Sequence, residues 1–382
     1  MKIIRQIERA VDNDAYDRIY YVQGTPDRLF PAGVSLVRVS DGVNGLINIL
    51  WLLLSIFNKI IAGKKQMKLT KKRYGPVIPV IIMIMALAGC QKDPEITREE
   101  YVQSFTEKVN SDSLGSYIQW LEGMGTRFAL ADNHREVAVR IRNRFISFGY
   151  PYARLDSFYL TKTYREVTYS TWQYNVIASV DGSVDDSICV VGAHYDDIVA
   201  EGDPFALAPG ANDNASGVAA VLEIARLVRR YRFRPEHTIR FVVFAAEEIG
   251  LNGSIDYVTK AATAGDKIMM MINHDMISYV ADPGAKPWYV NIVHYDNSLA
   301  LRNEAAALCS ANSILVPYSD NTSYNRSDSY PFFVAGFRAL FFHQSDIEST
   351  YHTTGDVTSV CNFEYCREIV RASCALVVDK NY

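Results

Sequence analysis

Three short apolar runs, each followed at once by histidine or carboxylate residues, constrain the fold of this chain more than any other feature. The runs occupy 187–193, 238–246 and 267–273, and strands buried on both faces of a parallel sheet have this nearly unbroken apolar character. Further strands are expected at 173–180, 289–294 and 338–343, and helices at 133–150, 214–231, 298–311 and 363–378. This alternation predicts a single α/β domain with three α/β/α layers and a mixed, largely parallel central sheet.

The polar residues that follow the runs are candidate metal ligands. They are His194 with Asp196, then Glu247 with Glu248, then Asp275, together with Asp213 in the turn 209–217 and His352 in a loop beyond 338–343. In a parallel sheet, segments leaving the carboxyl ends of strands meet in one crevice. A mixture of imidazole and carboxylate ligands suits zinc or a related divalent ion.

Six segments carry a family resemblance. They are GAHYD, PGANDNASGVAAVLEIAR, FAAEEIGLNGS, HDMIS, RSD and YHTTGD, in this order, and with them the chain resembles the M28 family of zinc aminopeptidases. The resemblance is dense from 190 to 356 and, by length, extends over 98–382. It implies a zinc-exopeptidase-like fold, two zinc ions per chain and a peptide substrate that loses its N-terminal residue.

The resemblance also implies a role for each candidate residue. Asp213 would bridge the two ions, one held also by His194 and Asp275, the other by Glu248 and His352. Glu247 would be the general base, acting on a hydroxide that two cations about 3.5–4 Å apart can hold between them. Asp196 would orient His194, Tyr351 would donate a hydrogen bond to the oxyanion, and Asp328 belongs to the segment behind the ligands, where Ser329 replaces a common histidine.

Two other functions fit the same fold. A glutaminyl cyclase would use Asp213, Glu248 and His352 but only one zinc ion. A non-catalytic binding relative would have lost ligands or the base, and none is lost here. The Glu247-Glu248 pair, with His194 and Asp275 both present, favours the peptidase.

The beginning of the chain predicts export. Residues 67–73 are strongly basic, 76–89 are apolar, and Leu87-Ala88-Gly89-Cys90 resembles the acylation site of bacterial lipoproteins. We expect a signal peptide at 67–90, a lipid anchor on Cys90, a tether at 91–97 and the peptidase domain at 98–382. Residues 1–66 would be upstream over-annotation before a true start at Met67, or an extra membrane segment. The predicted location is the cell envelope, at the outer membrane or the periplasmic face, and not the cytoplasm.

Charge and cysteine content exclude other classes. With 39 Lys and Arg against 43 Asp and Glu, the chain lacks the basic excess of a nucleic-acid-binding protein, and we expect no nucleic-acid partner. Six cysteines are too few for a disulfide scaffold. Cys361 and Cys366 could form a local disulfide in an oxidising compartment or stay free.

Overall fold

The computed structural model describes residues 96–184 and 186–382. Residues 1–66, the expected signal peptide at 67–90 with its Cys90, and all of the tether except its last two residues lie outside the described part. Within these described ranges, no helix is long and apolar enough to cross a membrane.

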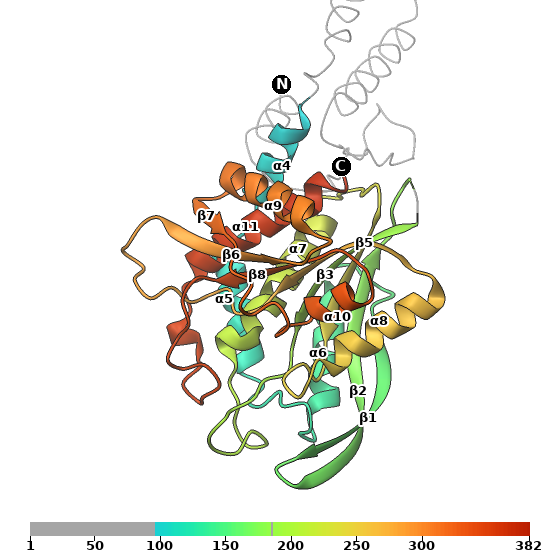
Figure 1. The fold of residues 1–382 in the computed structure, drawn as a ribbon, viewed down its shortest axis with the longest axis vertical. Helices are drawn as coiled ribbons and strands as arrows, with labels where there is room; N and C mark the ends of the chain where they lie inside the picture. The colour runs from blue at the N-terminus through green and yellow to red at the C-terminus, as the bar shows by residue number, and fades with distance from the viewer. Residues whose placement is uncertain (1–95, 185) are drawn as a thin grey trace, which may run out of the picture. The chain divides into compact units, whose positions relative to one another are not determined.

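In the part of the chain that the structure describes, eight strands form one sheet with helices on both faces (Figure 1). The strands are β1 (Arg154–Tyr164), β2 (Val167–Val180), β3 (Ser187–His194), β4 (Thr238–Phe244), β5 (Lys267–His274), β6 (Trp288–His294), β7 (Leu315–Tyr318) and β8 (Ala339–Gln344). The helices are α4 (Arg98–Thr106), α5 (Ser111–Glu122), α6 (His134–Ser147), α7 (Gly217–Arg230), α8 (Asn252–Ala264), α9 (Leu299–Asn312), α10 (Ser329–Val334) and α11 (Phe363–Asp379). Two short turns, η1 (Ala211–Ser216) and η2 (Thr358–Val360), precede α7 and α11.

The order of the strands is β1-β2-β4-β3-β5-β8-β6-β7. The central strands β4, β3, β5 and β8 are parallel to one another, whereas β1, β2 and β6 pair antiparallel with their neighbours toward the centre. The predicted mixed α/β/α architecture is therefore confirmed, with the parallel pairing concentrated in the middle of the sheet. All carboxyl ends of the four central strands consequently lie along one edge.

Each central strand contributes to two apolar layers, because successive side chains of a strand point to opposite faces. Cys189 and Val191 of β3 pack in the larger layer, which contains α4, α5, α6, α7, α9 and α11. Val190, between them, packs in the smaller layer with Tyr257 of α8 and Phe332 of α10. Burial on both faces explains why these strands are apolar at nearly every position.

The structure adds elements that periodicity does not reveal. Strand β1 at the sheet edge alternates between exposed and partly buried positions for most of its length, so it has no continuous apolar run. Helix α8 buries Gly253, Ser254 and Ala261 beside its larger residues, which weakens the apolar repeat. Also absent from the expectations are α4, α5, α10, β7 and the first half of β2. Cys361 and Cys366 are both free thiols, so the disulfide alternative is not formed.

Candidate metal centre

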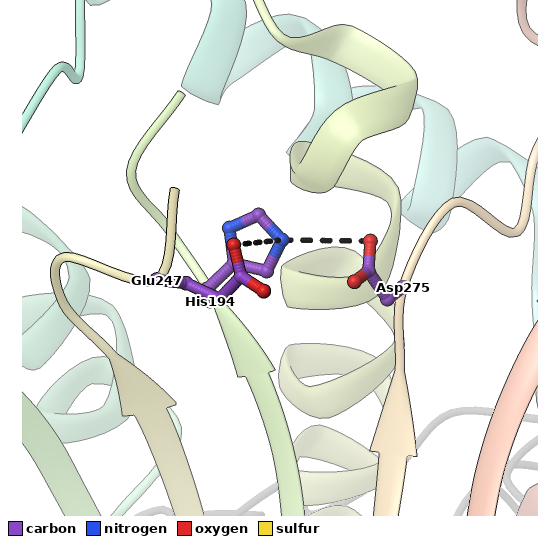
Figure 2. Close-up of side chains that lie close together, drawn as sticks. All are labelled: His194, Glu247 and Asp275. Atoms are coloured by element: carbon purple, nitrogen blue, oxygen red, sulfur yellow. Dashed lines mark ion pairs between the residues drawn. The ribbon is translucent and has the colours of Figure 1, made fainter. Parts of the chain in front are cut away.

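The predicted ligands come together at the carboxyl ends of the central strands. His194 is the last residue of β3, Glu247 lies three residues beyond β4, and Asp275 directly follows β5. Figure 2 shows these three side chains above neighbouring strands, with a dashed line from the imidazole of His194 to each carboxylate. The other ligands enter from loops, Asp213 from η1 and His352 from the loop beyond β8. The ends of the strands thus position one part of the candidate site, and the loops add the remaining side chains.

Asp213 lies between the two histidines. Its Oδ1 is 3.4 Å from Nε2 of His194, and its Oδ2 is 3.1 Å from Nε2 of His352. Each oxygen of one carboxylate therefore faces a different imidazole. A carboxylate that bridges two metal ions has this arrangement.

A further carboxylate completes each side of the site. On the first side, Oδ1 of Asp275 lies 3.4 Å and Oε2 of Glu247 lies 4.0 Å from Nε2 of His194. On the second side, Oε2 of Glu248 lies 3.0 Å from Nε2 of His352. Adjacent residues Glu247 and Glu248 thus turn toward different histidines.

Burial and crowding shift the acid–base properties of the site. Burial raises the pKa of Glu247 well above its usual value despite the opposing attraction of His194, and burial raises the pKa of Glu248 to about 8. Burial also disfavours an ionised Asp213, but its interactions with His194 and His352 outweigh it and lower the pKa of this carboxyl. For His352, interactions with Asp213 and Glu248 overcome burial and raise the pKa to about 10. The two imidazoles therefore act as cations opposite the carboxylates when no other positive charge is present.

The site fits a divalent cation because it gathers more acidic groups than cationic ones. Four carboxyl groups converge on two imidazoles, and burial raises the pKa of Glu247 and of Glu248, so these two favour their protonated forms until a cation takes the place of the proton. Oε1 of Glu248 is buried and accepts no hydrogen bond from the described residues. Buried charge without a partner is costly. The chemistry of these donors, nitrogen and oxygen at a fixed spacing, suits zinc.

Asp196 has two contacts at the site. Its backbone carbonyl accepts a hydrogen bond from Nδ1 of His194 at 3.1 Å, and its carboxylate oxygen is 3.8 Å from the same nitrogen. The carboxylate also accepts hydrogen bonds from the backbone N–H groups of Glu247 and Glu248, at 3.0 and 3.1 Å. One aspartate therefore holds both the first histidine and the turn that carries the glutamate pair.

Two further side chains support the ligands and received no role from the sequence. Ser327 donates a hydrogen bond of 2.6 Å to Oδ2 of Asp275. Asp356 accepts hydrogen bonds from the backbone N–H groups of Asn212 and Asp213, at 2.8 and 2.9 Å. Both lie in segments already quoted, RSD and YHTTGD, but the letters alone do not show which neighbour they contact.

The remaining candidates lie beside the centre. The ring of Tyr351 stacks on the imidazole of His352, with centroids 3.8 Å apart, and its side chain is 41% exposed. Its hydroxyl is thus within reach of solvent and substrate. Asp328 is fully buried, and burial raises its pKa to about 7.

Three non-glycine residues at the site have a left-handed backbone. Ala246 precedes Glu247, Met276 follows Asp275, and His352 is itself a candidate ligand, with φ values of 56°, 51° and 53°. This region costs energy for residues with a side chain and is often found where a site over-determines the backbone. Here it turns the chain sharply as it leaves β4 and β5.

Comparison with protein families gives one match over more than half of the chain. The model of peptidase family M28 matches residues 175–377, which include every candidate ligand and Glu247.

Individual relatives are similar over most of the described part. A probable aminopeptidase of Saccharomyces cerevisiae is 28% identical over 297 residues, which are 75% of this chain and 77% of that protein. A probable leucine aminopeptidase of Arthroderma otae is 29% identical over 51% of this chain. The chain spans only 54% of the length of that second relative.

Solved structures share the fold. The LapA aminopeptidase of Legionella pneumophila superposes with a TM-score of 0.63 at 21% identity, over 76% of this chain and 77% of that one. A glutaminyl cyclase of Bacteroides thetaiotaomicron superposes with a TM-score of 0.56 at 17% identity, over 71% and 98%. The architecture is therefore common to both reaction types, and the residues of the site must decide between them.

Proposed function

Because this chain belongs to peptidase family M28, we propose that it is a zinc-dependent aminopeptidase, which removes N-terminal residues from peptides. Its relatives named as aminopeptidases support this activity. The observation that carries the proposal is the position of Asp213, whose two oxygens face two different histidines. A single-zinc cyclase has no need for a carboxylate shared in this way.

The residues that would hold two zinc ions are His194 and Asp275 on one side, Glu248 and His352 on the other, and Asp213 between them. When bound, zinc polarises the scissile carbonyl and lowers the pKa of water near it. Ser327, Asp196 and Asp356 keep the ligands in place through the hydrogen bonds described above. Such support tunes ligand orientation and metal affinity.

Glu247 is the general base of the proposed reaction. Its carboxylate lies at the site without a close imidazole of its own, since the nearest nitrogen of His194 is 4.0 Å away. Burial raises the pKa of this carboxyl, which makes it a stronger base than an exposed glutamate. Glu247 would accept the proton of the attacking water on a carboxylate oxygen and deliver it to the leaving amine.

Tyr351 would stabilise the negative charge that develops on the carbonyl oxygen. Its hydroxyl can donate a hydrogen bond, and its stacking on His352 keeps the ring beside the metal ligands. A phenol here needs to stay protonated to act, and burial raises the pKa of Tyr351.

The test compares matched substrates on purified protein with a measured zinc content. We expect about two zinc ions per chain and cleavage of aminoacyl p-nitroanilides. N-acetylation of the same substrates should lower kcat/KM by on the order of 10²-fold, because a buried group that recognises the amine loses its partner. Cyclisation of N-terminal glutaminyl peptides with one zinc ion would instead identify a glutaminyl cyclase. Zinc binding without turnover of any of these substrates would point to a binding protein.

We also propose that the enzyme is anchored to the cell envelope through a lipid on Cys90. The basic, apolar and small-residue order of 67–90 supports this. Expression from Met67 should give a product that requires detergent for extraction, and Cys90→Ala should leave an unprocessed precursor. An unmodified Cys90 in the mass spectrum of the native protein would contradict the anchor.

A further inference from the structure

Arg127 lies outside every quoted motif, in the turn between α5 and α6. Its side chain is fully buried, and so is that of Asp197, whose Oδ2 lies 3.1 Å from Nη1 of Arg127. Burying a guanidinium is costly unless its donors are satisfied. The partners of these donors therefore show what the residue does.

The guanidinium donates to three backbone carbonyls. Nε donates to the carbonyl of Tyr195, Nη1 to that of Pro209 and Nη2 to that of Gly210, each at 2.8 Å. The backbone N–H of Arg127 donates to Oδ1 of Asp197 at 2.9 Å. One planar group thus joins two segments of chain, the one after β3 and the one before η1.

These two segments carry the ligands that face each other across the first metal position. Tyr195 directly follows His194, and Gly210 lies three residues before Asp213. Nε2 of His194 and Oδ1 of Asp213 are 3.4 Å apart. Any change in the spacing of the two segments would therefore change the spacing of these ligand atoms.

The close approach of Arg127 requires glycine at position 210. A Cβ added there would lie 2.7 Å from Nη2 of Arg127 and 2.5 Å from the carbonyl oxygen of Asp213. The φ of Gly210 is also +50°, which a side chain disfavours. The backbone at Gly210 thus passes close to the guanidinium. The neighbouring Thr126 contacts the same segment between β3 and η1, through a 2.6 Å hydrogen bond to the carbonyl of Pro204.

We propose that Arg127 is a positioning residue, which fixes the distance between His194 and Asp213 and thereby sets the affinity of the site for zinc. The inference rests on the proposed zinc peptidase function. It differs from a purely structural role, in which Arg127 would only neutralise Asp197. The planar fork of arginine can reach three carbonyls at once, whereas a lysine ammonium is a compact point charge.

Two variants separate the roles. Arg127→Lys keeps a positive charge beside Asp197 but loses the fork. The double variant Arg127→Met with Asp197→Asn removes both charges, so no unpaired charge stays buried, and the amide oxygen can still accept the backbone N–H at position 127. The zinc dissociation constant is measured by competition with a chelator, on protein whose folding is verified by circular dichroism. Both variants should bind zinc 10–100-fold more weakly, the usual effect of losing a group that orients metal ligands.

Arg240→Met is the matched control. Arg240 pairs with Asp266 at 2.5 Å near the start of β4, away from the carboxyl ends of the strands. The Arg240→Met variant should lower the melting temperature of the zinc-free protein and leave the zinc affinity within twofold of wild type. Zinc affinity within twofold of wild type in a folded Arg127 variant, or an equal loss in Arg240→Met, would overturn the role of Arg127. A wild-type protein that binds no zinc would instead overturn the proposed function and the inference together.

Discussion

The two ends of the central strands β3, β4 and β5 handle charge in opposite ways. At their carboxyl ends, four carboxylates and two imidazoles are packed together with little exposure. At their amino ends, ion pairs are partly or largely exposed, as between Arg240 and Asp266 or between Lys267 and Asp186. One end gathers more acidic groups than cationic ones, and the other end holds ion pairs.

This difference shows which end is built for stability and which for binding. Balanced, solvated pairs contribute modestly to folding and need no ligand. Buried carboxyl groups whose pKa values are raised in the folded state destabilise the free protein near neutral pH until a cation enters. The carboxyl ends should therefore control zinc and activity, and the amino ends should control only stability.

The largest effect is expected for Asp213→Asn. An amide bridges two cations poorly, so both ions should be weakened together. The value of kcat/KM should fall by more than about 10⁴-fold, beyond what loss of a proton-transferring group costs alone. Steady-state kinetics and metal analysis on the same preparation provide the measurement, and unchanged activity would remove Asp213 from the bridging position.

Glu247→Gln and Glu248→Gln should act differently although the residues are adjacent. The first change removes the base and should lower kcat by about 10²–10⁴-fold, with zinc content near two per chain. The second replaces a ligand, so one ion should be weakened or lost. If Glu247→Gln loses zinc and Glu248→Gln keeps both ions, the two roles are reversed.

Removal of zinc should lower the melting temperature, because a ligand that binds only the folded state stabilises it. Zinc at about 100 times its dissociation constant contributes about 2.7 kcal/mol. In the zinc-free protein, Glu248→Gln should melt at the same temperature as wild type or above it near pH 7, since the raised pKa of the Glu248 carboxyl costs folding free energy that an amide does not. Differential scanning calorimetry with and without chelator tests both statements, and a zinc-free variant that melts well below wild type would contradict the cost of the buried Glu248 carboxyl.

The smallest effect on activity is expected at the amino ends. Arg240→Met should lower the free energy of unfolding by about 0.5–3 kcal/mol, as typical single substitutions do, and leave kcat/KM within twofold. Denaturant unfolding and kinetics measure the two quantities separately. A large loss of activity in Arg240→Met would contradict the statement that the amino ends of the strands affect stability alone.

Much of the site could be predicted because its ligands follow conspicuous strands. An apolar strand that is buried on both faces can be recognised in the sequence as a continuous apolar run, and the residue that follows it then lies at the carboxyl end of the strand. For this reason the positions of His194, Glu247 and Asp275 could be anticipated. The pairing of Asp213 with both histidines required the family resemblance, since 139 positions separate Asp213 from His352.

Other features depend on contacts that no local pattern records. Arg127 occurs in the sequence GTRFALAD without any periodic signal, and its partners are 68 to 83 residues away. Edge strand β1 is mostly exposed or half-exposed, so burial does not shape its composition. Helix α8 buries small residues, which are compatible with a surface loop as well. Tertiary packing, rather than a local sequence pattern, determines the structure of Arg127, β1 and α8.

The place of β8 has a consequence for how the molecule assembles. This strand lies between β5 and β6 in the sheet, although it is the last strand in sequence. During synthesis, β5 and β6 can therefore pair with β8 only after residue 344 has been made. The loop that carries His352 follows later still. Such non-local pairing slows folding. We therefore expect the candidate metal centre to form late in folding, so that zinc binding reports a completed sheet.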